Sequence, residues 1–495
     1  MFTERDVRQL EERGIDPAAA ERQIERLRNP PRPVALARAA TVGDGISRLD
    51  PAEQELLESA AAAPAAAGRL MAFVPASGAA SRMFKDLRAA LDSPEPPSES
   101  EAGRGFFEGI DSFAFAGELR RRAGSIEPRT PDDERRILRT LLDELGYAET
   151  PKGLIPFHRT PEGPRTAFEE HLLQARRFLR AGDGTVRAHF TVAAEHKEEF
   201  ERALERIRPR IEATGCRLLV DFSVQRPSTD ALALDESGDP FRTSDGSLLF
   251  RPAGHGALLE NLEAAGGDVV IIRNIDNVVR DEASGEVVRW KRILVGALVR
   301  LQREVFDILG ACDRGAGEDA LARGLRLAKE RFGRVPRRAL ESSRETAEFV
   351  RAALERPIRV CGVVRNEGEP GGAPFWVTGP DGASSLQIVE SSQVDLGDPD
   401  QKKIWSSSTH FNPVDIVAGM RRRDGEPFAL ASFVDPDAVL VAKKSHEGSA
   451  LLALEIPGLW NGGMAGWNSL FVEVPAETFA PVKTVLDLLR PAHSG

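Results

Sequence analysis

This 495-residue chain has few cysteines and no long apolar run. Its three cysteines, Cys216, Cys312 and Cys361, are widely spaced and odd in number, so they indicate neither a disulfide framework nor a zinc site. No apolar run approaches the length needed to cross a bilayer. The start, MFTERDVRQLEERG, is charged and lacks the apolar stretch of a signal peptide. We therefore expect a reduced, cytoplasmic protein that does not contact a membrane.

Positive charge is also scarce, since the formal net charge is −11. This balance argues against general nucleic-acid binding, although a local basic pocket could still take a small anionic substrate. Only 10 of the 66 basic residues are lysine. Because arginine is the usual cation of this chain, a position that keeps lysine is one where a compact ammonium group is favoured over the planar guanidinium group of arginine.

The remaining composition, 41% hydrophobic and 29% charged, is that of a soluble globular protein large enough for more than one domain. Strand and helix patterns alternate over 151–300, which predicts a largely parallel sheet covered by helices. We expect a helical N-terminal segment (1–68), an α/β core (69–300) with an insertion at 86–150, a helical insertion (301–356), and a last part (357–495) that completes the sheet. The strands of this last part are predicted at 358–365, 375–378, 386–390 and 469–474.

The most informative motif is FVPASGAASRMFK, residues 73–85. The apolar run that leads into it predicts a strand, and the basic segment that ends it is compatible with a helix. Small side chains between the two let backbone N–H groups turn toward one point, which suits a phosphate-binding loop. Such a loop would use the N–H groups of Ala76, Ser77, Gly78, Ala79 and Ala80.

A second motif predicts a metal ligand. The apolar run DVVIIRNI predicts a strand that ends at Asp276. Its carboxylate would emerge at the carboxyl edge of the sheet, where open α/β sheets bind ligands. One or two carboxylates together with phosphate oxygens bind Mg²⁺. For a second ligand we favour Asp415 on chemical hardness, with His410 and Asn412 as the alternatives.

Further motifs follow in a fixed order along the chain. They are PKGLIPF (151–157), RPAGHGALLENL (251–262), NIDNVV (274–279), QIVESSQVD (387–395), STHFNPVDIV (408–417), AKKS (442–445) and ETFAPVKTVLDLL (477–489). With PASGAASRM they resemble the motifs of sugar-nucleotide pyrophosphorylases, and of the UDP-N-acetylhexosamine branch in particular. The close full-length resemblance is to an uncharacterised bacterial family of unknown function, and the resemblance to the pyrophosphorylases is distant.

This resemblance implies a mixed, mostly parallel Rossmann-like sheet of the GT-A nucleotidyltransferase type. It also implies the reaction: a sugar-1-phosphate attacks the α-phosphorus of a nucleoside triphosphate, with UTP expected, and pyrophosphate leaves. Mg²⁺ would be the cofactor. The partners would be these small molecules, without nucleic acid or membrane, and a monomer is compatible with the sequence.

The resemblance also assigns roles to single residues. Arg82 would hold the β- and γ-phosphates, and Lys152 would offset charge at the reacting phosphorus, a role for which Lys85 competes. The nucleobase would lie near Gln225, Gly254, His255 and Gly256. The sugar phosphate would meet Asn277, Glu390, Lys443, Lys444 and Lys483, with Lys443 also counted among the catalytic residues.

Two other functions remain open. Ser77 and Ala80 stand where the pyrophosphorylase loop has glycines, and His255 and Ala257 replace an asparagine and a glycine of the base loop. These changes are compatible with a catalytically silent protein that binds nucleotide sugars. A GT-A glycosyltransferase is the other alternative, but such enzymes usually carry Asp-x-Asp at the metal. A serine hydrolase is unsupported, because Ser77 lacks the Gly-x-Ser-x-Gly elbow.

Overall fold

A computed structural model describes residues 2–251, 254–315, 317–368, 371–379 and 384–494. The chain folds into two compact units, each assembled from three stretches of sequence. Unit 1 comprises Met1–Ala62, Gln225–Ile271 and Ile293–Val474, and unit 2 comprises Ala63–Val224, Ile272–Arg292 and Pro475–Gly495. The domain boundaries that we expect from the sequence stay predictions.

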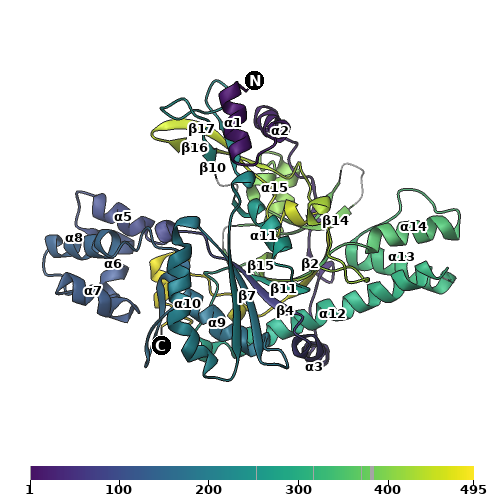
Figure 1. Ribbon diagram of the computed structural model, residues 1–495, viewed down its shortest axis with the longest axis horizontal. Coiled ribbons are helices and arrows are strands. Elements are labelled where there is room, and N and C mark those ends of the chain that lie inside the picture. The colour runs from purple at the N-terminus through teal and green to yellow at the C-terminus, as the bar shows by residue number, and fades with distance from the viewer. Residues whose placement is uncertain (1, 252–253, 316, 369–370, 380–383, 495) are drawn as a thin grey trace. The chain divides into compact units, whose positions relative to one another are not determined.

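Unit 1 contains the N-terminal helices, the long helices of the predicted 301–356 insertion and most of the later strands (Figure 1). Its helices are α1 Glu4–Glu12, α2 Pro17–Arg28, α3 Pro51–Ala60, α11 Leu258–Ala264, α12 Gly285–Asp313 (which begins in unit 2), α13 Glu318–Phe332, α14 Ser343–Leu354 and α15 Pro399–Ser406. Its strands are β1 Leu36–Ala39, β2 Thr41–Val42, β3 Gly45–Ser47, β9 Ala231–Leu234, β10 Phe250–Arg251, β12 Ile358–Arg365, β13 Ala373–Thr378, β14 Ser384–Val389, β15 His410–Gly419, β16 Leu440–His446, β17 Ser449–Glu455 and β18 Asn468–Glu473.

The strands of unit 1 belong to three sheets. In the large one, β2, β3, β18 and β12 are neighbours in that order and run parallel, and β15 pairs antiparallel with β12. The second has three strands in the order β1-β13-β14, and the third has four in the order β10-β9-β17-β16. The predicted strands at 358–365, 375–378, 386–390 and 469–474 correspond to β12, β13, β14 and β18.

The N-terminal segment, expected to be helical, begins with two separate helices, α1 and α2. A capping box at Thr3 caps the N-terminus of α1. After this helix the chain turns at Gly14, whose φ of +72° suits a residue without a Cβ. Helix α2 then starts at Pro17 behind the N-cap Asp16. The apolar positions of both helices pack against β9 and β17, so this segment covers the four-stranded sheet.

Unit 2 has a parallel set of strands in the order β4-β7-β8. Its strands are β4 Leu70–Pro75, β5 Pro156–Thr160, β6 Gly163–Thr166, β7 Thr185–Val192 and β8 Arg217–Val224, and β11 Val269–Arg273 enters it from unit 1. Its helices are α4 Ala62–Ala66, α5 Lys85–Asp92, α6 Glu101–Glu108, α7 Ala116–Ala123, α8 Pro131–Arg139, α9 Ala167–Phe178 and α10 Lys197–Glu212.

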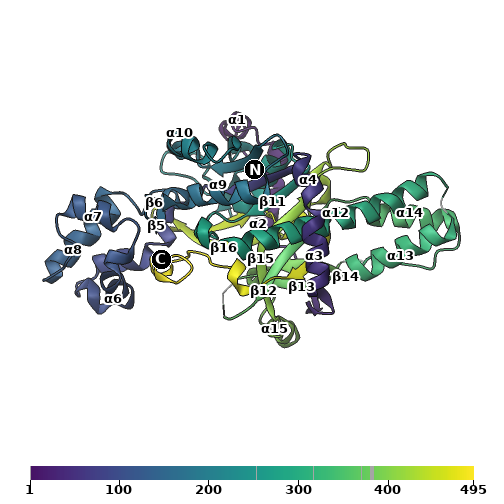
Figure 2. The same ribbon diagram turned by 90° about the horizontal axis from the view of Figure 1, so that it is seen from below.

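The predicted insertion at 86–150 is helical. Figure 1 shows α5 to α8 lying together, and Figure 2 shows the same of α6 to α8. Helix α8 ends at Arg139 and continues as a π-helical turn, Thr140–Glu144. Three aromatic rings of the insertion, from Phe106, Phe113 and Phe115, stack in sequence, with centroids 5.3 and 4.9 Å apart. This aromatic core holds the short helices together.

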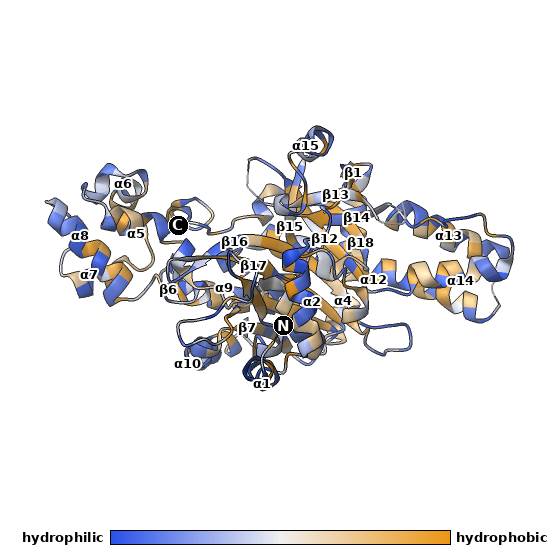
Figure 3. Cartoon of the chain, turned by 90° about the horizontal axis from the view of Figure 1, so that it is seen from above, coloured by the Kyte–Doolittle hydropathy of each residue, from blue (hydrophilic) through white to orange (hydrophobic). Residues whose placement is uncertain are grey.

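The fold is therefore mixed α/β with a large, mostly parallel sheet. Figure 3 shows hydrophobic residues (orange) along β12 and β18 and hydrophilic residues (blue) along α8 and α10. Among the described residues, no helix combines the length and the apolar character that a membrane span requires.

Candidate functional site

Unit 2 brings Lys152 and Asp276 together. Lys152 opens a short 3-10 turn (Lys152–Leu154), and Asp276 lies three residues beyond the end of β11. The Lys152 Nζ donates to Asp276 Oδ2 at 3.1 Å and to the backbone oxygen of Val482 at 3.0 Å. The lysine side chain is 14% exposed and the aspartate side chain 26%. The ion pair is thus partly shielded yet still open to a ligand.

The predicted phosphate loop, residues 76–79, lies beside this pair. It follows β4, and the Lys152 N–H donates to the Gly78 carbonyl at 3.0 Å. The N–H groups of Ala76 and Ala80 are already used by backbone carbonyls, those of Thr191 (2.7 Å) and Thr150 (2.9 Å). The N–H groups of the intervening three residues, 77–79, have no acceptor among the described residues, and all three residues are exposed. The expected cradle of five N–H groups is therefore reduced to three.

The two basic residues after the loop are exposed. Arg82 closes the 3-10 turn Ala80–Arg82, and Lys85 begins α5. Neither side chain forms an ion pair or hydrogen bond with the described residues. The spacing in the sequence cannot separate Lys85 from Lys152, but the structure places Lys152 on the Asp276 carboxylate.

The turn that carries Asp276 is held by polar side chains of α9. They are buried, although α9 faces the inside of unit 2, where apolar residues are the rule. The bonds run from His171 Nε2 to Ile275 O (3.1 Å), from Gln174 Nε2 to Val279 O (2.7 Å) and from the Asp281 N–H to Glu170 Oε2 (2.9 Å). Burial lowers the pKa of His171 well below its ordinary value, in keeping with a neutral ring that donates. The sequence signal for this support, a helix with polar residues on its inner face, was not recognised.

Asn277 has a structural place that the sequence did not indicate. Its side chain is buried, its Nδ2 donates to Thr478 O at 3.3 Å, and its Oδ1 accepts from the Ala480 N–H at 2.9 Å. These bonds fasten the C-terminal segment to the Asp276 turn. Both ends of its amide thus bind backbone in the described structure, and the expectation that Asn277 contacts sugar hydroxyls stays a prediction.

The C-terminal segment, residues 475–495, crosses the same part of unit 2. The Val482 N–H donates to the Asp276 carbonyl at 3.0 Å, and the Val485 N–H donates to the Met83 carbonyl at 3.0 Å. Lys483, expected near the sugar phosphate, is exposed and directly follows the residue that accepts from Lys152. This segment thus joins the turn of Asp276 to the helix side of the phosphate loop.

A buried chain of side chains anchors the end of this segment. His158 Nδ1 lies 3.0 Å from Glu170 Oε1, His158 Nε2 lies 2.9 Å from His493 Nδ1, and His493 Nε2 lies 3.1 Å from Ala480 O. Burial raises the pKa of Glu170 to about 8 and lowers the pKa of His158 to about 3 and that of His493 to about 4. The Ala480 carbonyl can only accept, so the neutral His493 ring donates from Nε2 and accepts at Nδ1. The neutral His158 ring likewise donates from Nε2 to His493 and accepts at Nδ1. Glu170 then donates its own proton to His158.

The other predicted residues lie in unit 1 on several elements. Gln225 follows β8 and donates to Asp230 Oδ1 at 3.3 Å, and Glu390 caps a 3-10 turn after β14. Gly254, His255 and Gly256 belong to the turn Gly254–Ala257, and the side chain of His255 lies outside the described part. A Cβ at Gly256 would lie 2.7 Å from the Ile456 carbonyl oxygen. Close packing alone therefore accounts for a glycine at this position.

The candidate metal and sugar-phosphate residues of unit 1 are spread over two sheets. Asp415 is buried on β15 of the large sheet. Lys443 and Lys444 are exposed on β16 of the four-stranded sheet, where Lys444 pairs with Glu455 at 3.6 Å. Among the described residues, no three His, Cys, Asp or Glu side chains gather as a metal-holding group.

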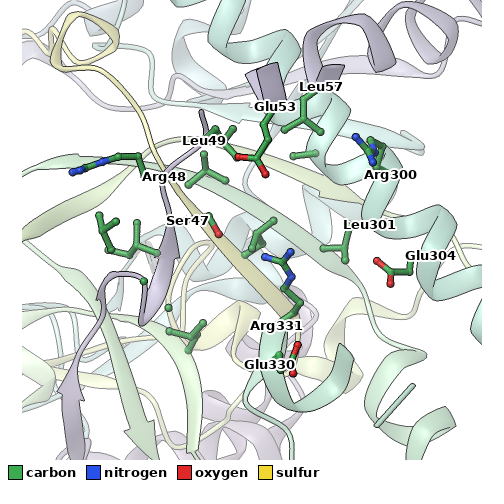
Figure 4. A pocket seen from close by; sticks show the side chains of 18 of the residues that line it. Ser47, Arg48, Leu49, Glu53, Leu57, Arg300, Leu301, Glu304, Glu330 and Arg331 are labelled. Atoms are coloured by element: carbon green, nitrogen blue, oxygen red, sulfur yellow. The ribbon is translucent and has the colours of Figure 1, made fainter. Parts of the chain in front are cut away.

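Unit 1 also contains a pocket of about 900 Å³ that the sequence did not indicate (Figure 4). Its walls come from α3, β3, α12, α13 and β18, and Figure 4 shows the charged side chains of Glu53, Arg300 and Arg331 together with the apolar side chains of Leu57 and Leu301. None of the predicted site residues is among its described lining.

The chain belongs to the family described as Domain of unknown function (DUF4301), whose model matches residues 3–494. No curated protein matches it. Among solved structures, it is similar to the UDP-N-acetylglucosamine pyrophosphorylase of Trypanosoma brucei in complex with an inhibitor, at 12% identity and a TM-score of 0.48, over 99% of this chain and 79% of that one. It is also similar to a mutant UDP-glucose pyrophosphorylase of Leishmania major in complex with UDP-glucose, at 13% identity and a TM-score of 0.46, over 99% and 79% of the two chains.

Proposed function

We propose that this protein is a nucleotidyltransferase of the GT-A type that joins a sugar-1-phosphate to a nucleoside triphosphate, UTP being the expected one. The products would be a nucleotide sugar and pyrophosphate. The observation that carries the proposal is the ion pair between Lys152 and Asp276, 3.1 Å apart, next to the loop 77–79, whose three N–H groups have no acceptor among the described residues. The ordered series of motifs in the sequence supports the same function.

The chemistry asks for placement and for neutralisation of charge rather than for a covalent intermediate. An oxygen of the sugar-1-phosphate forms a bond to the α-phosphorus, and the bond from that phosphorus to the leaving pyrophosphate breaks. The N–H groups of the loop 77–79 would bind phosphate oxygens, and Arg82 would bind the outer phosphates. Lys152 would offset the negative charge that grows at the α-phosphate, a task that suits a compact ammonium.

Asp276 fits a Mg²⁺ ion. Its carboxylate is a hard oxygen ligand that is partly exposed beside the phosphate loop, and Mg²⁺ usually binds one or two carboxylates with the remaining positions filled by phosphate and water. When bound, the ion would neutralise phosphate charge. Lys152 would then keep its second acceptor, the Val482 carbonyl. The roles expected for Gln225, Gly254, His255, Glu390, Asp415, Lys443, Lys444 and Lys483 stay predictions.

The test is release of pyrophosphate from each nucleoside triphosphate with Mg²⁺ and a panel of sugar-1-phosphates. The wild-type protein is compared with Lys152→Met and Asp276→Ala. Lys197→Met is the matched control, because Lys197 is a lysine of unit 2 with a side chain 44% exposed, and it pairs with Glu201 at 3.0 Å. Release that requires one sugar phosphate, Lys152 and Asp276, but not Lys197, supports the proposal. Saturable binding of a UDP-sugar without any release would instead indicate the catalytically silent binding protein.

A further inference from the structure

Unit 1 holds a second, smaller pocket whose lining is strongly positive. Its volume is about 380 Å³, within the range of small-molecule sites. Its described lining contains no acidic residue. The residues that matter here are Arg334, Arg337, Phe349, Arg356, Ser384 and Ser385.

Three chain segments build this pocket. Arg334 comes two residues after the end of α13, and Arg356 comes two residues after the end of α14. Ser384 and Ser385 open β14, which pairs with β13. Helices α13 and α14 pack on each other and appear side by side in Figures 1 and 2. The two arginines are therefore fixed by the ends of two packed helices.

The guanidinium groups of Arg334 and Arg356 converge on one oxygen. Arg334 Nη2 lies 3.2 Å from the Gly466 carbonyl oxygen, and Arg356 Nη1 lies 2.9 Å from the same atom. Their other acceptors are also neutral: Asn468 Oδ1 and Trp467 O for Arg334, and Ala352 O for Arg356. Two positive charges are thus held together, and every described acceptor they have is uncharged.

Such an arrangement is costly unless an anion completes it, because a desolvated charge without a counter-ion is unfavourable and two like charges repel. The effect is visible in the pKa of Arg334, which burial, followed by the charge of Arg356, lowers to about 10. Capping of α14 accounts for the bond from Arg356 Nε to Ala352 O. It does not account for the two guanidinium groups that share the Gly466 carbonyl oxygen.

The remaining lining adds a donor and an apolar wall. Ser385 Oγ accepts a hydrogen bond from Gln387 Nε2 at 3.1 Å, so the hydroxyl proton is left to point toward another acceptor. Phe349 and Ala352 of α14 line the pocket beside Arg356. A ligand that fits these walls carries an anionic oxygen group and an apolar part.

We propose that this pocket binds a small molecule with a phosphate or carboxylate group, held by Arg334, Arg356 and the Ser385 hydroxyl, with its apolar part against Phe349. The site lies wholly in unit 1 and does not depend on the function proposed for the Lys152 and Asp276 site of unit 2. Guanidinium groups bind both anions through paired hydrogen bonds, so the experiment separates them.

The probes are inorganic phosphate, phenyl phosphate and benzoate, added at constant ionic strength with chloride as the balancing ion. Binding is measured by calorimetry and by the rise in melting temperature. We expect phenyl phosphate or benzoate to bind more tightly than inorganic phosphate, and Arg356→Gln to weaken that binding by about tenfold or more. Arg344→Gln is the matched control, since Arg344 is an 87% exposed arginine of α14 that pairs with Glu348 at 2.9 Å.

Two further variants keep the test decisive. Ser385→Val removes the hydroxyl donor without removing a charge, so it reports on the pocket even if Arg356→Gln fails to fold. Lys152→Met removes the cation of the other site, and it must leave the binding unchanged. Equal affinity in wild-type protein, Arg356→Gln and Ser385→Val would overturn the proposal. So would the absence of binding to the wild-type protein, or a loss of binding in Lys152→Met alone.

Discussion

Lys152 and Asp276 are separated by 124 positions in the sequence, and their charged groups lie 3.1 Å apart in the folded chain. The pair joins three segments: the turn after the helical insertion, the end of β11, and the C-terminal segment through Val482. Each acceptor of the ammonium is a single oxygen atom, which matches a compact cation better than a planar one. Lysine is rare in this chain, and at position 152 its compact ammonium group fits the two oxygen atoms that accept from it.

The first prediction concerns this match. Lys152→Arg keeps the charge but places a fork where two separate oxygen atoms are held at 3.1 and 3.0 Å. We expect the rate of pyrophosphate release to fall by about a hundredfold, with little change in melting temperature. Lys85→Arg, at the exposed start of α5, should leave the rate near that of the wild-type protein. The opposite pattern would give the catalytic role to Lys85.

The second prediction separates two glycines near the site. A Cβ built at Gly78 meets nothing within 4 Å, whereas one at Gly153 lies 3.1 Å from the Phe200 ring and 3.2 Å from an Ile275 side-chain carbon. Gly153→Ala should destabilise the protein by about 1–3 kcal/mol, because the packed neighbours must shift.

Gly78→Ala should instead leave the melting temperature unchanged and weaken UTP binding, because its new methyl group would stand where phosphate approaches the loop. Thermal unfolding and calorimetric titration of each variant with Mg²⁺ and UTP check both statements. A Gly78→Ala variant that binds UTP like the wild-type protein would remove the loop 77–79 from the proposed site.

Much of this framework could be predicted from local sequence. The strand before the loop, the strand that leads to Asp276 and the strand at 358–365 each contain a short apolar run, and all three are present. The strand that leads to Asp276, β11, ends at Arg273, three residues earlier than expected. The break at Gly14 and the π-helical turn after Arg139 could not be predicted, because helical periodicity alone does not mark where a helix changes register or ends.

The candidate site could be predicted only in part, for a different physical reason. The sequence shows which residues could carry chemistry, but not which partners their side chains bind in the folded protein. Asn277 illustrates this limit. Its amide donates to the Thr478 carbonyl and accepts from the Ala480 N–H, partners about two hundred positions away in the chain. The polar inner face of α9 is likewise explained only by the fold, in which its side chains bind the backbone around Asp276.

The third prediction tests the anchor of the C-terminal segment. His493→Ala removes the acceptor of the His158 Nε2 proton and the donor to the Ala480 carbonyl. A buried donor without a partner should cost about 1–3 kcal/mol. Hydrogen exchange of the Ala480 and Val482 N–H groups should accelerate, and Ser494→Ala, which loses one bond to the Arg490 carbonyl, is the control. Unchanged exchange in His493→Ala would show that the Asn277 bonds hold the segment alone.

The last prediction follows from the raised pKa of Glu170. In the folded protein this pKa is about 8, against an ordinary 4.5, with burial as the largest cause. Between these values the folded state keeps a proton that the unfolded state releases, so the free energy of unfolding should fall as pH rises. His158 and His493 act in the opposite sense, but only below their ordinary pKa of 6.5. From pH 6.5 to 8, Glu170 is the member of this network that titrates.

Glu170→Gln separates these contributions, because a glutamine amide can donate to His158 Nδ1 and accept from the Asp281 N–H as protonated Glu170 does. We expect similar stability of the two proteins at pH 6.5. The decline of the wild-type protein toward pH 8, with a slope of up to about 1.4 kcal/mol per pH unit, should be absent in the variant. Urea unfolding at several pH values measures both curves. If the variant declines as steeply as the wild-type protein, Glu170 is ionised throughout and His158 must carry the compensating charge.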